Sequence, residues 1–256
     1  MPGMSPVALL LLLPLLQCSA RPSAGRDPEY LPPLPQGVLQ ASDLQYRRVA
    51  QTAVQYLNYQ QGSPSLLRKV VYLAKTSVRN IPGVGHVYSL RFYTKHIQTG
   101  QNLGKCSANV LYQKTSKPVI EINCANNKDA DQIKKDDFNL YTKLKATSSP
   151  DELKYFANIG SSYIAWKQAN EYVGYHMKEI KDAKKRERDN ALEFDYTVLI
   201  GSDDLKDLTC HMQITWNLDL PIKVKYDCPT EESSAESADG SGEESGSYDY
   251  LVDTNF

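Results

Sequence analysis

The fold is decided by two segments of similar pattern, 106–124 (CSANVLYQKTSKPVIEINC) and 210–228 (CHMQITWNLDLPIKVKYDC). In each segment, apolar residues alternate with polar ones on both sides of a short turn. Because successive side chains of a strand point to opposite faces, this alternation predicts an antiparallel hairpin with one buried face. Each segment begins and ends with a cysteine, so a disulfide would join the two strands of each hairpin.

The N-terminal stretch 1–20 has the pattern of a secretory signal. An apolar core from Val7 to Leu16 precedes Gln17-Cys18-Ser19-Ala20, which predicts cleavage after Ala20. The competing interpretation is a membrane anchor, but ten helical residues are too short for a hydrocarbon core of about 30 Å. No later apolar run has the length of a membrane span, so we expect a secreted protein with no membrane partner.

Removal of Cys18 with the signal leaves four cysteines, Cys106, Cys124, Cys210 and Cys228. They allow three pairings. The repeated spacing of 18 positions and an oxidising compartment favour Cys106–Cys124 and Cys210–Cys228. Zinc binding is the competing interpretation, and it is disfavoured because no two cysteines form a C-x2-4-C pair.

The similarity of the two halves continues upstream of the hairpins. Two further alternating runs precede the first hairpin, at Leu67–Ser77 and His86–Ile97, and two precede the second, at Tyr175–Lys184 and Ala191–Ile200. Each half is therefore predicted to contain four antiparallel strands.

A helix is predicted before each set of strands. The first opens at a capping-box pattern beginning at Ser42 and is ended by Gly62 and Pro64. The second has aromatic and apolar residues at helical spacing from Phe156 to Val173 and is ended by Gly174; we expect these aromatics in the core. A third, connecting helix is predicted at Asp131–Lys145.

The predicted fold class is α+β, with two tandem modules that each pack a helix on a four-stranded antiparallel sheet. The predicted boundaries are a signal peptide (1–20), a Pro-rich arm (21–40), a first module (41–126), a linker with a helix (127–157), a second module (158–228) and a disordered acidic tail (229–256).

The tail dominates the charge balance of the chain. The whole chain has 29 Lys and Arg against 30 Asp and Glu, but residues 229–256 contain eight acidic residues and no Lys or Arg. The tail therefore carries a charge of -8 and the preceding residues +7. Carboxylates suit Ca2+, so the tail predicts contact with Ca2+ or a calcium mineral; the alternative is a tail that only solvates the chain. Ser234 and Ser241 match the pattern Ser-x-Glu and are phosphorylation candidates that would add acceptor oxygens.

Catalytic chemistry is not predicted. The four histidines, His86, His96, His176 and His211, are scattered, with no H-E-x-x-H pattern and no close pair. We therefore expect no enzyme activity, no catalytic residues, no bound metal and no cofactor, and we expect His211 to be an ordinary surface histidine. No motif for nucleic acid is present either, and nucleic acid is not an expected partner.

Five short strings together resemble the latexin family, in particular its secreted branch, over about residues 40–228; they are NYQQGSP (58–64), GKCSA (104–108), GSSY (160–163), FDYTVL (194–199) and KVKY (223–226). The resemblance implies two cystatin-like modules joined by the connecting helix. It also implies a non-enzymatic inhibitor of metallocarboxypeptidases, and the acidic tail favours an eggshell-type, mineralising extracellular matrix.

In the family, the turn before the third strand of the second module contributes to the contact with carboxypeptidase. The resemblance therefore implies an inhibitory loop at Asp203, Asp204, Leu205, Lys206, Asp207 and Leu208. This stretch is more acidic than the family pattern and one residue shorter. The alternative function is a matrix protein that modulates mineralisation without inhibiting a protease.

Overall fold

The computed structural model describes residues 41–114, 116–147, 149–202 and 205–229, with backbone only at 41 and 42. The predicted signal, the arm, the acidic tail beyond Pro229, Ser234, Ser241, Asp203 and Asp204 lie outside the described residues. Within the described part, no helix is both long and apolar enough to cross a bilayer.

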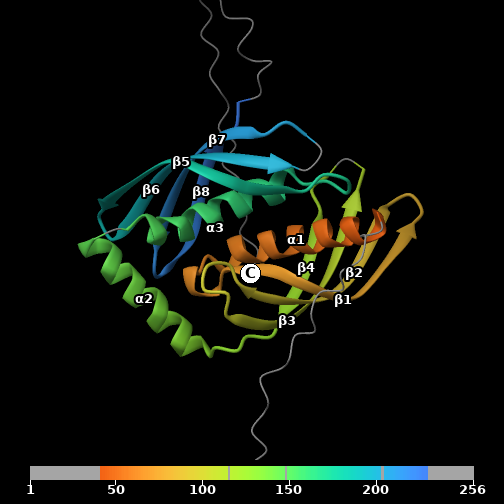
Figure 1. The fold of residues 1–256 in the computed structure, drawn as a ribbon, viewed down its shortest axis with the longest axis horizontal. Coiled ribbons are helices and arrows are strands. Elements are labelled where there is room, and N and C mark those ends of the chain that lie inside the picture. Colours follow the sequence, from red (N-terminus) through yellow and green to blue (C-terminus); the bar gives the residue numbers. More distant parts are fainter. Residues whose placement is uncertain (1–40, 115, 148, 203–204, 230–256) are drawn as a thin grey trace, which may run out of the picture. The chain divides into compact units, whose positions relative to one another are not determined.

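Eight strands form two separate four-stranded antiparallel sheets, in the orders β1-β2-β3-β4 and β5-β6-β7-β8 (Figure 1). The first sheet consists of β1 (Arg68–Ile81), β2 (Gly85–His96), β3 (Asn102–Gln113) and β4 (Val119–Cys124). The second consists of β5 (Tyr175–Arg188), β6 (Ala191–Ser202), β7 (Leu208–Asn217) and β8 (Leu220–Asp227). With three α-helices, the architecture is α+β, which confirms the predicted class and is consistent with two tandem modules.

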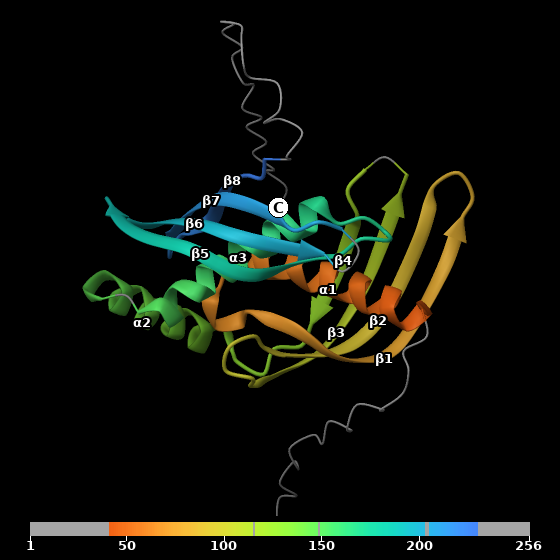
Figure 2. The ribbon, with the colours of Figure 1, turned by 45° about the horizontal axis from the view of Figure 1, so that its top comes forward.

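Each sheet is covered by one long helix. The elements outside the sheets are α1 (Ala41–Gln61), the short 3-10 helix η1 (Pro64–Leu66), α2 (Ala130–Ala146) and α3 (Pro150–Gln168). Figure 2 shows α1 on the first sheet and α3 on the second, with the two helices side by side between the sheets. Helix α2 lies within the range predicted as linker, and the domain boundaries themselves remain a prediction.

Helix α3 begins earlier and ends earlier than its sequence pattern predicts. It begins after Ser149 because Ser149 and Glu152 form a capping box, in which each side chain accepts a hydrogen bond from the other's backbone N–H. It ends at Gln168 rather than near Val173. There, the Asn170 side chain accepts hydrogen bonds from the backbone N–H groups of Tyr172 and Val173, and this turn replaces the helix.

Both disulfides predicted from the cysteine spacing are present, Cys106–Cys124 and Cys210–Cys228. The first joins directly opposed residues of β3 and β4. Each closes a loop of 18 positions, which in the chain-entropy model stabilises the fold by roughly 3 kcal/mol.

The two helices meet through aromatic side chains. The rings of Tyr56 and Trp166 lie 5.0 Å apart and those of Tyr59 and Tyr163 lie 4.3 Å apart, with Tyr56 and Tyr59 on α1 and the other two on α3. Trp166 also packs against the core of the first sheet. These aromatics join the two halves. Of the aromatics of α3 predicted to lie in the core, Phe156 is fully buried there, whereas Tyr163 and Trp166 are half-buried at the contact with α1.

A buried arginine crosslinks the first sheet. The side chain of Arg68, at the start of β1, is 1% exposed and donates to Thr94 Oγ1 and to the Leu103 carbonyl, both at 2.8 Å. It also reaches Asn126 beyond β4. The Asn58 side chain of α1 bonds both the N–H and the C=O of Arg68, each at 2.9 Å. Arg68 thus links α1 and β1 to β2, β3 and the segment that follows β4.

Gly160 sets the approach of α3 to the second sheet. A Cβ atom at this position would lie 2.7 Å from both Ile214 Cδ1 and Met212 Sδ. We expect Gly160→Val to lower the free energy of unfolding by about 1–3 kcal/mol through overpacking, measured by urea denaturation. Gly174→Ala is the control, because its Cβ would lie 3.5 Å from the nearest atom. Equal midpoints for the two variants would contradict the close contact.

Candidate functional site

The predicted inhibitory loop connects β6 to β7, and its described residues are Leu205, Lys206, Asp207 and Leu208. The Leu205 side chain is 52% exposed, while Leu208 is the first residue of β7. Asp207 forms an ion pair with Lys178 of β5, with 2.7 Å between Lys178 Nζ and Asp207 Oδ1. The loop therefore presents an apolar side chain to solvent from a tethered backbone.

A glycine in β6 makes this tether possible. Lys178 belongs to β5, and its side chain crosses β6 at Gly201 to reach Asp207. A Cβ atom at Gly201 would lie 2.1 Å from Lys178 Cε, so any larger residue would displace the lysine. Lys181, also on β5, donates to Thr209 Oγ1 at 3.2 Å and adds a second link across β6.

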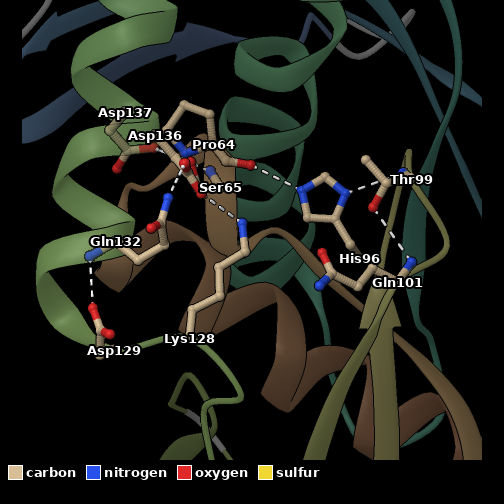
Figure 3. A network of polar contacts seen from close by, with 10 residues as sticks. All are labelled: Pro64, Ser65, His96, Thr99, Gln101, Lys128, Asp129, Gln132, Asp136 and Asp137. Atoms are coloured by element: carbon tan, nitrogen blue, oxygen red, sulfur yellow. Dashed lines mark hydrogen bonds and ion pairs between the residues drawn. The ribbon is translucent and has the colours of Figure 1, made fainter.

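A serine, a histidine and an aspartate come together where η1, β2 and α2 meet (Figure 3). Ser65 Oγ donates to Asp137 Oδ1 at 2.6 Å, and the Ser65 N–H reaches the same oxygen at 3.2 Å. His96 is 5% exposed, and its Nε2 lies 3.0 Å from the Pro64 carbonyl. In a catalytic triad the histidine would lie between serine and aspartate. Here, the serine bonds the aspartate directly, so these contacts are structural.

The network fixes the protonation state of His96. Its Nδ1 accepts hydrogen bonds from the backbone N–H groups of Gln98 and Thr99, so the proton is on Nε2 and points to Pro64. Burial lowers the pKa of His96, and the positive charges of Lys128 and Lys69 lower it further against the opposing effect of the Pro64 carbonyl. The neutral ring closes the turn between β2 and β3.

Helix α2 is attached to the first sheet by the same network. Burial raises the pKa of Asp137, against the hydrogen bonds from Ser65 and Ser63. Lys128 pairs with Asp136 at 2.8 Å, and Asp129 caps the helix by accepting from the Gln132 N–H at 2.7 Å (Figure 3). Sequence reasoning missed this network because its members lie in separate elements and match no motif.

Another polar contact joins β2 to the segment after α3. Glu171 Oε1 lies 2.7 Å from His86 Nδ1 and accepts from the Tyr88 hydroxyl at the same distance. Burial and the Glu171 acceptor raise the pKa of Tyr88, so the phenol stays a donor. Arg48 and Gln55 of α1 donate to the carbonyls of Tyr172 and Tyr175, which extends this connection between the halves.

None of the histidines forms a metal centre within the described residues, where no group of three or more His, Cys, Asp and Glu side chains has the necessary arrangement. His211 is exposed on β7, as predicted for a surface histidine, and its Nδ1 lies 3.1 Å from Thr197 Oγ1.

Comparison with known proteins confirms the resemblance predicted from the five strings. A family model described as Latexin matches residues 39–234. Ovocalyxin-32 of Gallus gallus is 34% identical, with 96% of each chain covered. Latexin of Homo sapiens is 30% identical over 70% of this chain and 90% of its own length. Retinoic acid receptor responder protein 1 of Homo sapiens is 28% identical over 78% of this chain and 76% of its own length.

His96 should make stability depend on pH. Its pKa is lowered by folding, so the unfolded state takes up a proton near pH 6.5 while the folded state resists it. The stabilisation is complete above this pH and is lost as the pH falls toward the folded-state pKa, by at most about 1.4 kcal/mol per pH unit. We expect His96→Gln to reduce this slope between pH 7.5 and 5.5, measured by urea denaturation.

The control for this experiment is His211→Gln, since His211 is exposed on β7. It should keep the slope of the unchanged chain. The same slope in all three proteins would contradict a buried, neutral His96.

Proposed function

Because the chain belongs to the latexin family, we propose that it is a secreted extracellular matrix protein of eggshell type that inhibits a metallocarboxypeptidase without performing catalysis. The observation that carries the proposal is the family match over residues 39–234, which includes all eight strands and three α-helices. Inhibition takes place by docking a folded surface over the entrance to the protease active site.

The inhibitory contact is assigned to the loop before β7. Supporting this, Leu205 is a large apolar side chain with 52% of its surface exposed, and the adjoining Asp207 is held by Lys178. The ion pair restricts the end of the loop next to β7, and a segment that is restricted before binding loses less conformational entropy when it binds.

Secretion is supported by two independent features. The stretch 1–20 has the apolar core and small residues of a signal peptide. The two disulfides, which join neighbouring strands in each half, belong to an oxidising compartment.

The second candidate function is modulation of mineral growth without protease inhibition. It is favoured by the eight acidic residues of 229–256 and by the Ser-x-Glu sites at Ser234 and Ser241. Carboxylate and phosphate oxygens are hard ligands for Ca2+, and phosphorylation would add about -1.5 to -2 charges per site. In this role the tail contacts Ca2+ or a calcium mineral, and the folded part positions it in the matrix.

Inhibition is tested by titrating the purified chain against a carboxypeptidase A-type enzyme and measuring peptide hydrolysis. We expect Leu205→Asp to raise the inhibition constant about tenfold or more, since a charge replaces an apolar contact in the interface. Leu218→Asp is the matched control, because Leu218 is exposed on the turn between β7 and β8, away from the loop. Unchanged hydrolysis at micromolar excess of the chain would reject inhibition.

The role of the tail is tested by measuring calcite growth with the full chain, with its phosphatase-treated form and with a chain that stops at Pro229. We expect growth modulation to weaken after dephosphorylation and to weaken further without the tail, because both steps remove oxygen ligands for Ca2+. Equal effects of the three proteins would remove the tail from the proposed function.

A further inference from the structure

The positive charge of the chain is concentrated in the half that contains the first sheet. Residues 41–126 contain eleven Lys and Arg against two acidic residues, a net charge of +9. Residues 127–228 contain sixteen basic and eighteen acidic residues, a net charge of -2. The two halves share a strand order but differ by eleven charges.

Strand register brings these cations together on the outer face of the first sheet. Lys75 of β1 lies directly opposite Arg91 of β2, and Lys69 lies opposite Lys95. Arg91 is exposed, and the neighbouring Leu90 and Phe92 are buried against α1. The Lys75–Arg91 row continues across β3 and β4 with Ser107 and Asn123, so two cations stand beside a hydroxyl and an amide.

These like-charged pairs do not serve the stability of the fold. Lys and Arg directly opposite each other on neighbouring strands repel and destabilise the pairing. In the described part of the chain, Lys69, Lys75, Arg91 and Lys95 form no ion pair with any carboxylate. On the outer face of the second sheet, by contrast, two cations have carboxylate partners: Arg186 pairs with Asp195 at 2.5 Å and Lys184 with Asp182 at 3.1 Å.

A shallow groove of about 520 Å³ lies over the Lys75–Arg91 row of the first sheet. Its lining includes the cations Lys75 and Arg91, the hydroxyls of Ser77 and Ser89, and the amide of Asn109. Arginine and hydroxyl groups together bind the oxygens of sulfate or phosphate esters through several hydrogen bonds. Glu121 is the one carboxylate in the lining, at the β4 side.

We propose that the outer face of the first sheet is a binding site for a sulfated polysaccharide. The choice of ligand rests on the secreted location in the proposed function, because such polymers are extracellular. Opposed residues of neighbouring strands lie about 5 Å apart, and the two charge pairs lie about 13 Å apart along β2, where four positions separate Arg91 from Lys95. Two pairs of cations, one after the other along the strands, can bind successive units of a linear polymer. Each disaccharide of such a polymer carries several sulfate and carboxylate groups.

The acidic segment 229–256 of the chain itself is a weaker match for this face. Its eight carboxylates comprise two adjacent pairs, Glu231-Glu232 and Glu243-Glu244, and four single residues further apart. Adjacent side chains of an extended chain point to opposite sides, so each Glu-Glu pair would present one carboxylate, not two, to the Lys75–Arg91 pair.

The test measures binding of the full chain to a heparin oligosaccharide by calorimetry at 0.15 M salt. Lys75→Ser with Arg91→Ser should weaken binding about tenfold or more and flatten its salt dependence, because fewer counterions are released. The matched control is Lys184→Ser with Lys225→Ser, which removes the same charge from the second sheet and should change binding less than about twofold.

Thermal unfolding separates binding from folding. The Lys75/Arg91 double variant should unfold at the same temperature as the full chain or higher, since a like-charge repulsion is removed. Equal weakening by both double variants, or no binding at all, would overturn the proposal. Binding only by a chain that stops at Pro229 would also overturn it and would make the acidic segment the occupant. Each of these failures leaves protease inhibition untouched.

Discussion

The first sheet depends on a buried cation, Arg68, that has no anionic partner among the described residues. Arg68 is held by neutral oxygens alone, and its Nε has no hydrogen-bond partner among the described residues. Burial lowers its pKa to about 10, which still leaves the guanidinium charged at neutral pH. The planar guanidinium carries several N–H donors and hydrogen-bonds residues near the ends of separate strands. Truncation of the side chain would leave these buried acceptors without a donor. The hydrogen bonds of Arg68 hold α1, β1 and the strand ends beside the β2–β3 turn in their relative positions.

The second sheet reaches the same topology by a different interaction. Phe156 of α3 stacks on Phe194 of β6 with ring centroids 4.2 Å apart, and Trp216 packs beside them at 4.8 Å. Within the residues described, Arg68 is the one buried lysine or arginine. The second half is therefore held by packing of aromatic rings at the place where the first half is held by the hydrogen bonds of Arg68. The contact between helices α1 and α3 then joins the two halves.

Features that depend on local pattern were predictable from sequence, and features that depend on distant contacts were not. Alternation and cysteine spacing predicted both hairpins and both disulfides, since each lies within one segment. The burial of Arg68 was not predictable, because a charged residue at a strand end has the pattern of an exposed one. The start of α3 was missed at Ser149, and the contacts of Trp166 with α1 join residues more than a hundred positions apart. For the candidate loop, the sequence predicted its position between two strands. The ion pair of Lys178 with Asp207, which passes over Gly201, could be found only in the structure.

In this chain the exposed charges differ between the two halves while both cores stay apolar. The two sheets could therefore acquire different surfaces without a change of fold. The cores of both sheets are apolar, and apart from Arg68 and Glu152 no Lys, Arg, Asp or Glu of the described residues is buried, so the charge difference between the halves resides mostly outside the cores. Exposed substitutions away from caps and buried groups usually change stability by less than about 0.5 kcal/mol. The fold therefore constrains the outer face of the first sheet little. An accumulation of unpaired cations there, against the repulsion of opposed lysines and arginines, requires a benefit outside the fold. The paired charges of the second sheet require none.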